Sequence, residues 1–418
     1  MKIIVMGSGI IGVTSAYYLA KSGHEVTVID KNPDTALSCS MSNGGQLSYS
    51  HIDSFLPSNS LLFLIKTLFK RGLFFKAQEI SNPDFIKFCL KLYENNKEGN
   101  KIKNSINLYN INTLSKLALE EIMQEEKIDF YHKKNGILHF YRNNKLFNSA
   151  IKNAIMLEKI GCSVDIFDSQ KSVDKVNDLS KLSDNKKLRG GIFFENDQTG
   201  DAFIFANKLA NICKEKYNVK FEFNSNIKNI FTNYQKITGI HTDKGVISGD
   251  IYVYALGSEG LRLINGINVN HNIFPLKGYS ISMPISSDFK APEIGLTDPE
   301  NKIVYSNLGK NFRAAGTIEI SDLNSKINFS RLNFIKKITK DSLKNYGNID
   351  DLCYWQGFRP CRPNLTPYIC EVKKFKNLFI NSGHGHLGWT MACGSSKILS
   401  NKINGKSEKV FDFLDNIN

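Results

Sequence analysis

The chain has 418 residues, of which 41% are hydrophobic, and a formal net charge of +14. This composition is typical of a folded globular protein, and the length requires more than one hydrophobic core. The 54 basic residues are spread along the chain without a basic run or a nucleic-acid-binding motif, so we expect no nucleic-acid partner.

The first 30 residues follow the pattern of a dinucleotide-binding βαβ unit. An apolar strand over residues 2–6 leads into the turn Gly7-Ser8-Gly9-Ile10-Ile11-Gly12, and a helix over 13–22 follows. A second strand over 25–29 ends at Asp30. This order of elements indicates that the turn binds a dinucleotide at the N-terminus of the helix.

Each position of the turn has a physical role in that interpretation. Gly7 permits the tight turn, Gly9 lets the backbone approach a pyrophosphate, and Gly12 lets helix and strand pack closely. Asp30 is placed to bond a ribose hydroxyl. Because NAD and FAD both contain ADP, the turn by itself does not choose between them.

The following segment favours FAD. Residues 40–46 read Ser-Met-Ser-Asn-Gly-Gly-Gln, a stretch rich in hydroxyls, amides and glycine. Such a segment can wrap a phosphate or a flavin with its backbone N–H groups, although an ordinary polar loop has a similar composition.

Residues 54–76 are unusually apolar, and their charged residues are all cations. Between Leu61 and Phe75 a helix would carry an apolar face beside Lys66, Lys70 and Arg71, which is typical of a helix lying in a membrane interface. A helix buried within its own domain explains the pattern equally well. No apolar run is long enough to span a bilayer.

The remaining pattern alternates helices with short strands. Helices are predicted at 82–127, 144–160, 203–217, 331–346 and 389–400. Strands are predicted at 137–141, 190–194, 219–223, 227–230, 237–242, 245–247, 250–258, 279–283, 303–306 and 312–318. The buried strand that ends near Gly257 is expected to return beside the first glycine turn. The fold class is therefore α/β, a Rossmann-like FAD-binding domain with an inserted mixed-sheet α+β substrate domain.

The predicted domains are built from separated segments. Residues 1–53, 200–262 and 352–418 are assigned to the FAD-binding domain. Residues 54–199 and 263–351 are assigned to the substrate domain.

Two dense motifs occupy the last part of the chain. Residues 355–363 read Trp-Gln-Gly-Phe-Arg-Pro-Cys-Arg-Pro, and residues 381–391 read Asn-Ser-Gly-His-Gly-His-Leu-Gly-Trp-Thr-Met. With the N-terminal turn, residues 42–46, 198–201 and 275–280, the chain resembles the D-amino acid oxidase superfamily of flavoproteins, and within it the bacterial D-amino acid dehydrogenases. The family commonly has Asp-Gly after Pro363, where this chain has Asn364-Leu365.

The resemblance implies a non-covalent FAD and a small D-amino acid substrate. The motifs assign the cofactor to Gly7, Gly9, Ile10, Ile11, Gly12, Asp30, Lys31, Ser42, Asn43, Gly44, Gln46, Ile227, Gly257, Gly383, His384, Gly385, Leu387, Gly388, Trp389 and Thr390. No metal is expected.

Arg359 is the candidate for the substrate carboxylate, because a planar guanidinium binds a carboxylate through two hydrogen bonds. Arg362 is the weaker alternative. Lys277 is a candidate for tuning the flavin or a solvated cation at a strand end. His384 and His386 are interpreted as hydrogen-bonding spacers.

The implied activity is oxidative deamination to a 2-oxo acid and ammonium by hydride transfer to flavin N5, with electrons passed to a respiratory quinone or another acceptor. Two alternatives stay open, an oxygen-using glycine or sarcosine oxidase and a non-catalytic flavin- or RNA-associated protein. The eight scattered cysteines and the absence of a signal sequence predict a cytoplasmic protein, with peripheral attachment to the inner face of the membrane as a further possibility.

Overall fold

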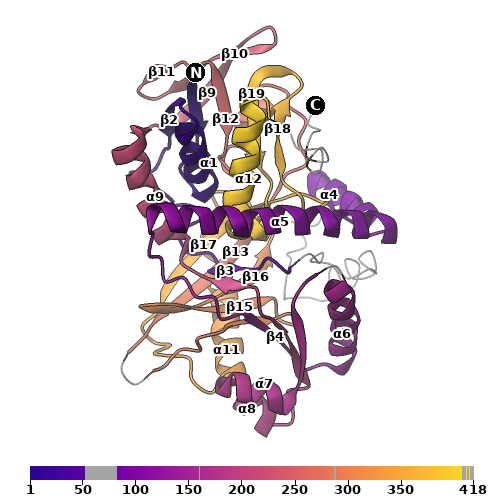
Figure 1. Ribbon diagram of the computed structural model, residues 1–418. Helices are drawn as coiled ribbons and strands as arrows, with labels where there is room; N and C mark the ends of the chain where they lie inside the picture. The colour runs from indigo at the N-terminus through magenta and orange to yellow at the C-terminus, as the bar shows by residue number, and fades with distance from the viewer. Residues whose placement is uncertain (52–81, 160, 287–288, 407–410, 412–413, 415–418) are drawn as a thin grey trace.

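The computed structural model describes residues 1–51, 82–159, 161–286, 289–406, 411 and 414. Two large sheets organise these residues, one around the N-terminal strand and one in the other half of the molecule (Figure 1). In the described part of the chain, no helix is long and apolar enough to cross a membrane.

The first sheet has six strands and contains the N-terminal βαβ unit. Its order is β18 (Tyr368–Val372), β19 (Phe375–Ser382), β12 (Ile251–Tyr254), β1 (Lys2–Met6), β2 (Glu25–Ile29) and β8 (Lys220–Glu222). All neighbours are parallel except β18 and β19. Along β1, Ile3 and Val5 pack into one core and Ile4 and Met6 into another, because a parallel sheet is covered on both faces.

Helices cover one face of this sheet. They are α1 (Ile10–Lys21), α5 (Glu98–Glu126), α9 (Ala202–Tyr217) and α12 (Gly388–Ile403), with residues of all four in one apolar core. Figure 1 shows α5 crossing α12, where the Gly394 amide donates to the Ser115 hydroxyl at 3.0 Å. The other face carries α10 (Leu261–Gly266) and the antiparallel meander of β9 (Ile227–Asn233), β10 (Lys236–Thr242) and β11 (Gly245–Ile247).

The second sheet has eight strands and is mixed. Its order is β17 (Cys353–Cys361), β13 (Phe274–Pro284), β16 (Asn311–Glu319), β15 (Ile303–Leu308), β14 (Gly295–Asp298), β4 (Ile137–Tyr141), β6 (Gly190–Phe194) and β5 (Val164–Asp168). Only β14 and β4 pair in parallel among these neighbours.

The two faces of the eight-stranded sheet differ in character. One face is apolar, with Tyr279 and Ile281 of β13 packed in a core with Leu332 and Ile335 of α11 (Phe329–Ser342). Because strand side chains alternate, the opposite face of β13 presents Gly278, Ser280 and Ser282. We call this opposite face the polar face; it meets the loop that follows Asp30.

Shorter elements complete the described chain. They are β3 (Gln46–Leu47) paired with β7 (Gln198–Thr199), and the helices α4 (Pro83–Asn95), α6 (Asn144–Lys159), α7 (Ser169–Lys175) and α8 (Ser180–Asp184), with single 3₁₀ turns at Asn177–Leu179 and Gly385–Leu387.

The predicted fold class is confirmed, and most predicted elements lie within a few residues of their expected places. The strands β3, β5, β7, β14, β17, β18 and β19 were not anticipated as strands. The proposed interface segment, Leu61 to Phe75, lies outside the described residues.

One predicted domain boundary differs from the sheet pairing. The segment from residue 352 was assigned to the FAD-binding domain, yet β17 is an edge strand of the eight-stranded sheet. It pairs with β13 over nine positions, from Cys353 opposite Ser282 to Cys361 opposite Phe274. Hydrogen bonding to β13 therefore places this strand in the eight-stranded sheet. The chain returns to the six-stranded sheet only after Cys361, with β18.

Candidate functional site

The first glycine turn is built as the sequence predicts. Gly7 has φ +105°, and a Cβ there would lie 2.8 Å from the Ala255 oxygen. A Cβ on Gly12 would lie 1.8 Å from the Gly7 oxygen, so only glycine lets α1 approach the turn. Gly9 is the N-cap of α1 and contributes no side chain, while the Ile10 amide at the first position of the helix donates to the Ser40 hydroxyl at 3.0 Å. An anion at this helix end would therefore meet the other amides of the first turn.

The register of the sheet brings other loops to the same edge. Met6 pairs with Ile29 and Tyr254, and Tyr254 pairs with Ile380. The loops that follow β1, β2, β12 and β19 consequently leave the same edge of the sheet, as expected for a binding site at the carboxyl ends of parallel strands.

Asp30 holds the first turn in place. Its Oδ2 accepts from the Ser8 amide at 2.7 Å and the Ser8 hydroxyl at 2.8 Å. Its Oδ1 accepts from the amide and the side chain of Asn32, both at 2.9 Å. The carboxylate predicted to bind a ribose is thus engaged by the protein, and a ribose would have to share or replace one of these four bonds.

The neighbours of Asp30 connect the loops around it. Lys31 forms an ion pair with Glu259 at 2.6 Å, close to Gly257, whose φ is +57°. Ile227 is buried at the start of β9, and its carbonyl accepts from Arg262 at 3.3 Å. These residues border the site through backbone and packing contacts.

Residues 42–46 lie against the polar face of the eight-stranded sheet. The carbonyls of Ser42 and Gly44 accept from the hydroxyls of Ser280 and Ser306 at 2.8 and 2.7 Å. A Cβ on Gly44 would lie 2.5 Å from a methyl of Val304, so the close approach requires glycine. Gln46 Nε2 donates to the Leu296 carbonyl at 2.9 Å.

Arg313 fixes the same segment and was not singled out from the sequence. This buried side chain of β16 donates to the Ser282 hydroxyl at 3.0 Å and the Asn43 carbonyl at 3.3 Å, and lies 3.6 Å from Asp201. The sequence contained a signal for this role, because an arginine inside an otherwise apolar strand needs a buried partner.

The second glycine turn follows β19 and opens α12. Gly383 and Gly385 have φ of +91° and +59°, and Gly388 begins the helix, whose N-cap Leu387 makes no side-chain cap bond. Two flanking residues bind neighbouring loops, as the Trp389 indole donates to the Gly200 carbonyl and Thr390 Oγ1 accepts from the Ser48 amide, both at 3.0 Å. The turn therefore presents the N-terminus of a second helix, without a side-chain bond from its N-cap residue, to the site.

The histidines of this turn are buried. Burial lowers the pKa of His384 to about 3 and that of His386 well below its ordinary value. Burial thus favours the neutral form of both imidazoles. The interpretation of these residues as hydrogen-bonding spacers stays a prediction.

Arg359 lies on the polar face of β17. A Cβ on Gly278 would lie 2.3 Å from a guanidinium nitrogen of Arg359, so the guanidinium lies directly over that glycine. Its Nη1 donates to the Thr317 carbonyl at 3.0 Å. Burial lowers its pKa, but the group stays charged, and no carboxylate among the described residues lies within ion-pair distance of it.

The structure does not bring Lys277 to Arg359. Lys277 is fully buried on the apolar face, where its Nζ donates to the Ser325 hydroxyl at 2.9 Å and the Lys326 carbonyl at 2.8 Å. It also lies 3.9 Å from Glu319. The alternative that Lys277 is a solvated cation does not fit its burial.

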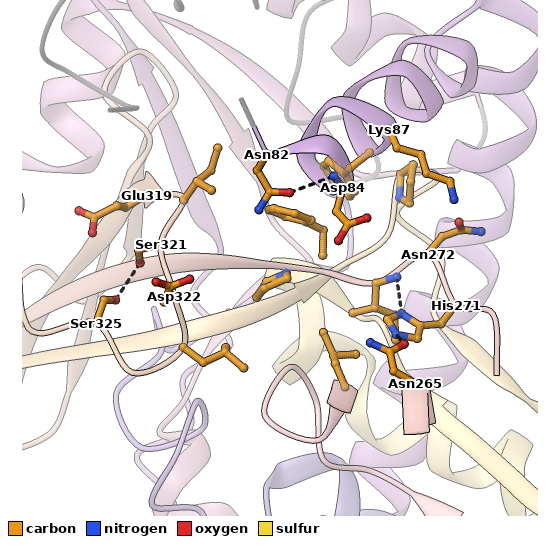
Figure 2. A pocket seen from close by; sticks show the side chains of 18 of the residues that line it. Asn82, Asp84, Lys87, Asn265, His271, Asn272, Glu319, Ser321, Asp322 and Ser325 are labelled. Carbon is orange, nitrogen blue, oxygen red and sulfur yellow. Dashed lines mark hydrogen bonds between the residues drawn. The ribbon is translucent and has the colours of Figure 1, made fainter. Parts of the chain in front are cut away.

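A cavity of about 1020 Å³ is lined by residues that do not include Arg359. Figure 2 shows Asp84, Lys87, Asn272 and Asp322 around it, from α4 and from the loops before β13 and after β16. None of the glycine-turn residues lines it. Its apolar wall includes Phe274, which packs with Leu276, the residue paired with Arg359.

A dinucleotide fits the edge where the glycine turns meet. Two helix N-termini whose own N-cap residues make no side-chain bond, and two cradles that a Cβ would fill, lie there. The buried hydroxyls of Thr35 and Ser258, beside the first turn and Gly257, have no hydrogen-bond partner in the described structure. Fold and site together define a dinucleotide-binding α/β protein whose second sheet covers the cofactor edge.

Comparison with known proteins narrows this class. A family model described as DAO, FAD dependent oxidoreductase, matches residues 2–402. The chain belongs to this family, so it is an FAD-dependent oxidoreductase, and the predicted cofactor is confirmed.

Solved structures share the fold over the whole chain. Glycine oxidase from Bacillus cereus ATCC 14579 matches with a TM-score of 0.74 and 18% identity, covering 100% of this chain and 98% of that one. L-proline dehydrogenase from P. horikoshii matches with 0.73 and 18%, covering 99% and 96%. FAD-bound L-alpha-glycerophosphate oxidase from Mycoplasma pneumoniae matches with 0.72 and 16%, covering 98% and 96%.

Proposed function

We propose that this oxidoreductase is a D-amino acid dehydrogenase. A hydride leaves Cα of a D-amino acid whose amine is neutral, and the resulting imino acid reacts with water to give a 2-oxo acid and ammonium. The observation that carries the proposal is Arg359, a charged guanidinium on the polar face with no described carboxylate partner.

The cofactor would be held by the two glycine turns without a covalent bond. The N-termini of α1 and α12 would face its negatively charged groups, and residues 42–46 would lie between it and the eight-stranded sheet. When bound, FAD supplies the acceptor for the hydride. The protein contributes binding, orientation and electrostatics.

Arg359 would orient the substrate by its carboxylate. One of its donors is used by Thr317, and a guanidinium has four more. Arg362 is the weaker candidate, because it donates to the Thr366 carbonyl at 2.7 Å and lies 3.4 Å over the Tyr368 ring. Gly278 leaves the space above β13 that the Arg359 guanidinium occupies.

A second candidate is an oxygen-using oxidase of glycine or sarcosine. The similarity of the fold to that of a glycine oxidase supports this second candidate. The two functions differ in substrate and in electron acceptor, and neither difference is encoded in the glycine turns.

The test is anaerobic reduction of the purified, FAD-loaded protein. D-alanine, L-alanine, glycine and sarcosine are added separately, and flavin absorbance is followed. Bleaching by D-alanine alone, with little oxygen consumption in air, is the expected result. Bleaching by glycine or sarcosine with oxygen consumption would establish the second candidate, and bleaching by none would contradict both.

We further propose a respiratory quinone as the acceptor, or another acceptor reached from the cytoplasm. The support is the sequence pattern of Leu61 to Phe75, which suits attachment to the inner face of a membrane.

A further inference from the structure

The guanidinium of Arg359 lies over one of two paired glycines. Gly278 of β13 is directly opposite Gly357 of β17. The three atoms nearest to a Cβ on Gly278 would all belong to the Arg359 guanidinium, at 2.3 to 2.4 Å. The neighbouring place over Gly357 is taken by the Trp355 ring, which a Cβ there would meet at 1.9 Å. The guanidinium therefore occupies the place of a side chain that Gly278 lacks.

A β-bulge lies opposite Gly278 on the other side of β13. The pairing of β13 with β16 shifts by one residue at Gly278, which faces both Thr317 and Ile318. Thr317 has φ +60°, a left-handed conformation that a β-branched residue rarely adopts. Bulges of this kind re-aim the groups of the additional residue relative to the sheet.

At this bulge, the Thr317 carbonyl is bonded to the guanidinium. It accepts from Arg359 Nη1 at 3.0 Å, while the Thr317 amide donates to the Lys302 carbonyl at 3.3 Å. The Thr317 hydroxyl is buried and has no hydrogen-bond partner among the described residues. A left-handed β-branched residue and an unpaired buried hydroxyl both cost stability, and backbone strain of this kind is concentrated at functional sites.

The chain that follows the bulge is held on the opposite face of the sheet. Glu319 is paired with Lys277 across the strands, and its carboxylate accepts from the Asn328 side chain at 2.7 Å. Arg331 lies 3.5 Å from the same carboxylate. Because the backbone is bonded on both sides of the bulge, the strained conformation of Thr317 persists.

We propose that Gly278 and the bulge at Thr317 position the guanidinium of Arg359 for the substrate carboxylate. The proposal rests on the proposed function, which takes Arg359 as the partner of that carboxylate. Gly278 supplies the space and the Thr317 backbone supplies the acceptor, so the remaining N–H groups of the guanidinium keep one orientation. Both are positioning residues, because each acts through Arg359.

The first test is Gly278→Ala in the FAD-loaded protein. Propionate, which is D-alanine without its amine, is titrated while the flavin spectrum is followed. The Kd for propionate is expected to rise at least about tenfold, because the new methyl group displaces the guanidinium. The fold should tolerate the change, since Gly278 is not left-handed and the atoms nearest to the methyl are the end of a flexible side chain.

The same substitution in an Arg359→Ala background separates positioning from general damage. Gly278→Ala should have no further effect there, because the atoms nearest to the new methyl are absent. The kcat/KM for D-alanine, measured in the same four proteins, extends the comparison to affinities too weak for titration. Gly266→Ala, at the end of α10 with no atom within 4 Å of its Cβ position, is the matched control and should behave as wild type.

Two substitutions at Thr317 test the bulge. Thr317→Pro cannot adopt φ +60° and lacks the amide that donates to Lys302, so it should lose propionate affinity as Gly278→Ala does. Thr317→Gly adopts this φ freely and keeps the carbonyl, so its Kd should stay within about threefold of wild type and its Tm should be unchanged or higher. If Thr317→Pro fails to fold, Thr317→Gly and the Gly278→Ala comparison still decide.

The results that would overturn the proposal differ from those that would overturn the proposed function. Wild-type affinity in Gly278→Ala, or an equal loss in the Arg359→Ala background, rejects the positioning role and leaves Arg359 as the carboxylate partner. A large loss of affinity in Thr317→Gly rejects the role of the bulge. No propionate binding by the loaded wild type, or unchanged affinity in Arg359→Ala, rejects Arg359 as the partner, and the positioning role with it.

Discussion

Lys277 and Arg359 show how the face of a strand decides what a cation does. They lie on adjacent strands, yet Lys277 is on the apolar face with hydroxyl and carbonyl partners, and Arg359 is on the polar face with one carbonyl partner. Arg313 is buried, and its donors are directed to protein oxygens, whereas the half-buried Arg362 donates to the Thr366 carbonyl and lies over the Tyr368 ring. Of these cations, Arg359 is the one that we propose as the partner of the substrate carboxylate.

Replacement of Arg359 by Ala should therefore weaken substrate binding and turnover. Loss of a charge-assisted pair of this kind costs roughly 2–5 kcal/mol, so kcat/KM should fall by about 1.5 to 3.7 orders of magnitude. Arg359→Lys keeps the positive charge but cannot form the planar bidentate pair of hydrogen bonds, so it should recover part of the lost kcat/KM. Steady-state kinetics and FAD content are measured together. Wild-type kinetics in Arg359→Ala would mean that another residue binds the substrate carboxylate.

Asp197 gives a pH-dependent prediction. Burial raises its pKa to about 7, while its Oδ1 accepts from the Ser50 amide at 2.9 Å. The folded state keeps the proton that the unfolded state releases near pH 4, so this residue costs stability increasingly from about pH 4 to pH 7 and by a constant amount above that.

Asp197→Asn should accordingly gain stability relative to wild type as the pH rises. The Tm difference, variant minus wild type, is expected to be more positive at pH 8 than at pH 5, equivalent to a few kcal/mol. Asp350→Asn, at a carboxylate that is 88% exposed, is the matched control and should show no such trend. The same Tm difference for Asp197→Asn at both pH values would mean that Asp197 is ionised in the folded protein.

At the scale of elements, glycines decide how closely α1 and the segment 42–46 approach their neighbours. Gly12 lies against the backbone of Gly7, and Gly44 against Val304. In both places a Cβ would meet atoms that belong to the site or to the sheet beneath it. The turn could be recognised from the sequence because its spacing is local, whereas the contact of Gly44 with β15 could not.

Gly12→Ala should displace α1 from the turn. Overpacking of this kind costs about 1–3 kcal/mol, and we expect FAD affinity to fall at least about tenfold because the helix N-terminus moves. FAD affinity is measured by flavin fluorescence, and stability by thermal unfolding. Gly99→Ala, in the first turn of α5 with no atom near its Cβ position, is the control and should be neutral or slightly stabilising. Normal FAD binding by Gly12→Ala would contradict the assignment of the turn.

At the scale of the whole molecule, the two sheets are each assembled from distant segments. The six-stranded sheet combines strands from residues 2–29, 220–254 and 368–382, and the eight-stranded sheet combines residues 137–194 and 274–361. The segment 42–46 lies where the two sheets meet. Its carbonyls accept hydrogen bonds from Ser280, Ser306 and Arg313 of the eight-stranded sheet. Each sheet therefore contributes one side of the site.

The net charge of +14 and the segment from Leu61 to Phe75 predict membrane association. The protein should sediment with anionic vesicles at low salt and be released as salt screens the attraction. Leu64→Glu with Leu68→Glu should abolish sedimentation and spare dye-linked activity.

The matched control for that experiment is Leu90→Glu with Leu117→Glu. These leucines are exposed on α4 and α5, and the control changes the net charge equally. It should sediment nearly as wild type. Equal sedimentation of all three proteins would show that the segment does not contact the membrane.

The sequence by itself determined the local units of this protein. The βαβ unit with Gly7, Gly9 and Gly12, the meander of residues 227–247 and the main helices follow from periodicity and turn residues, which act between neighbours in the chain. The FAD assignment followed from these units and from the motifs that resemble the flavoprotein family.

Only the tertiary structure decided which side chains share the site. The pairing of β17 with β13, the commitment of Asp30 to Ser8 and Asn32, and the bonding of residues 42–46 to Ser280 join residues up to hundreds of positions apart or depend on side-chain geometry. No local pattern encodes such contacts, because they exist only once the two sheets have closed around the cofactor edge.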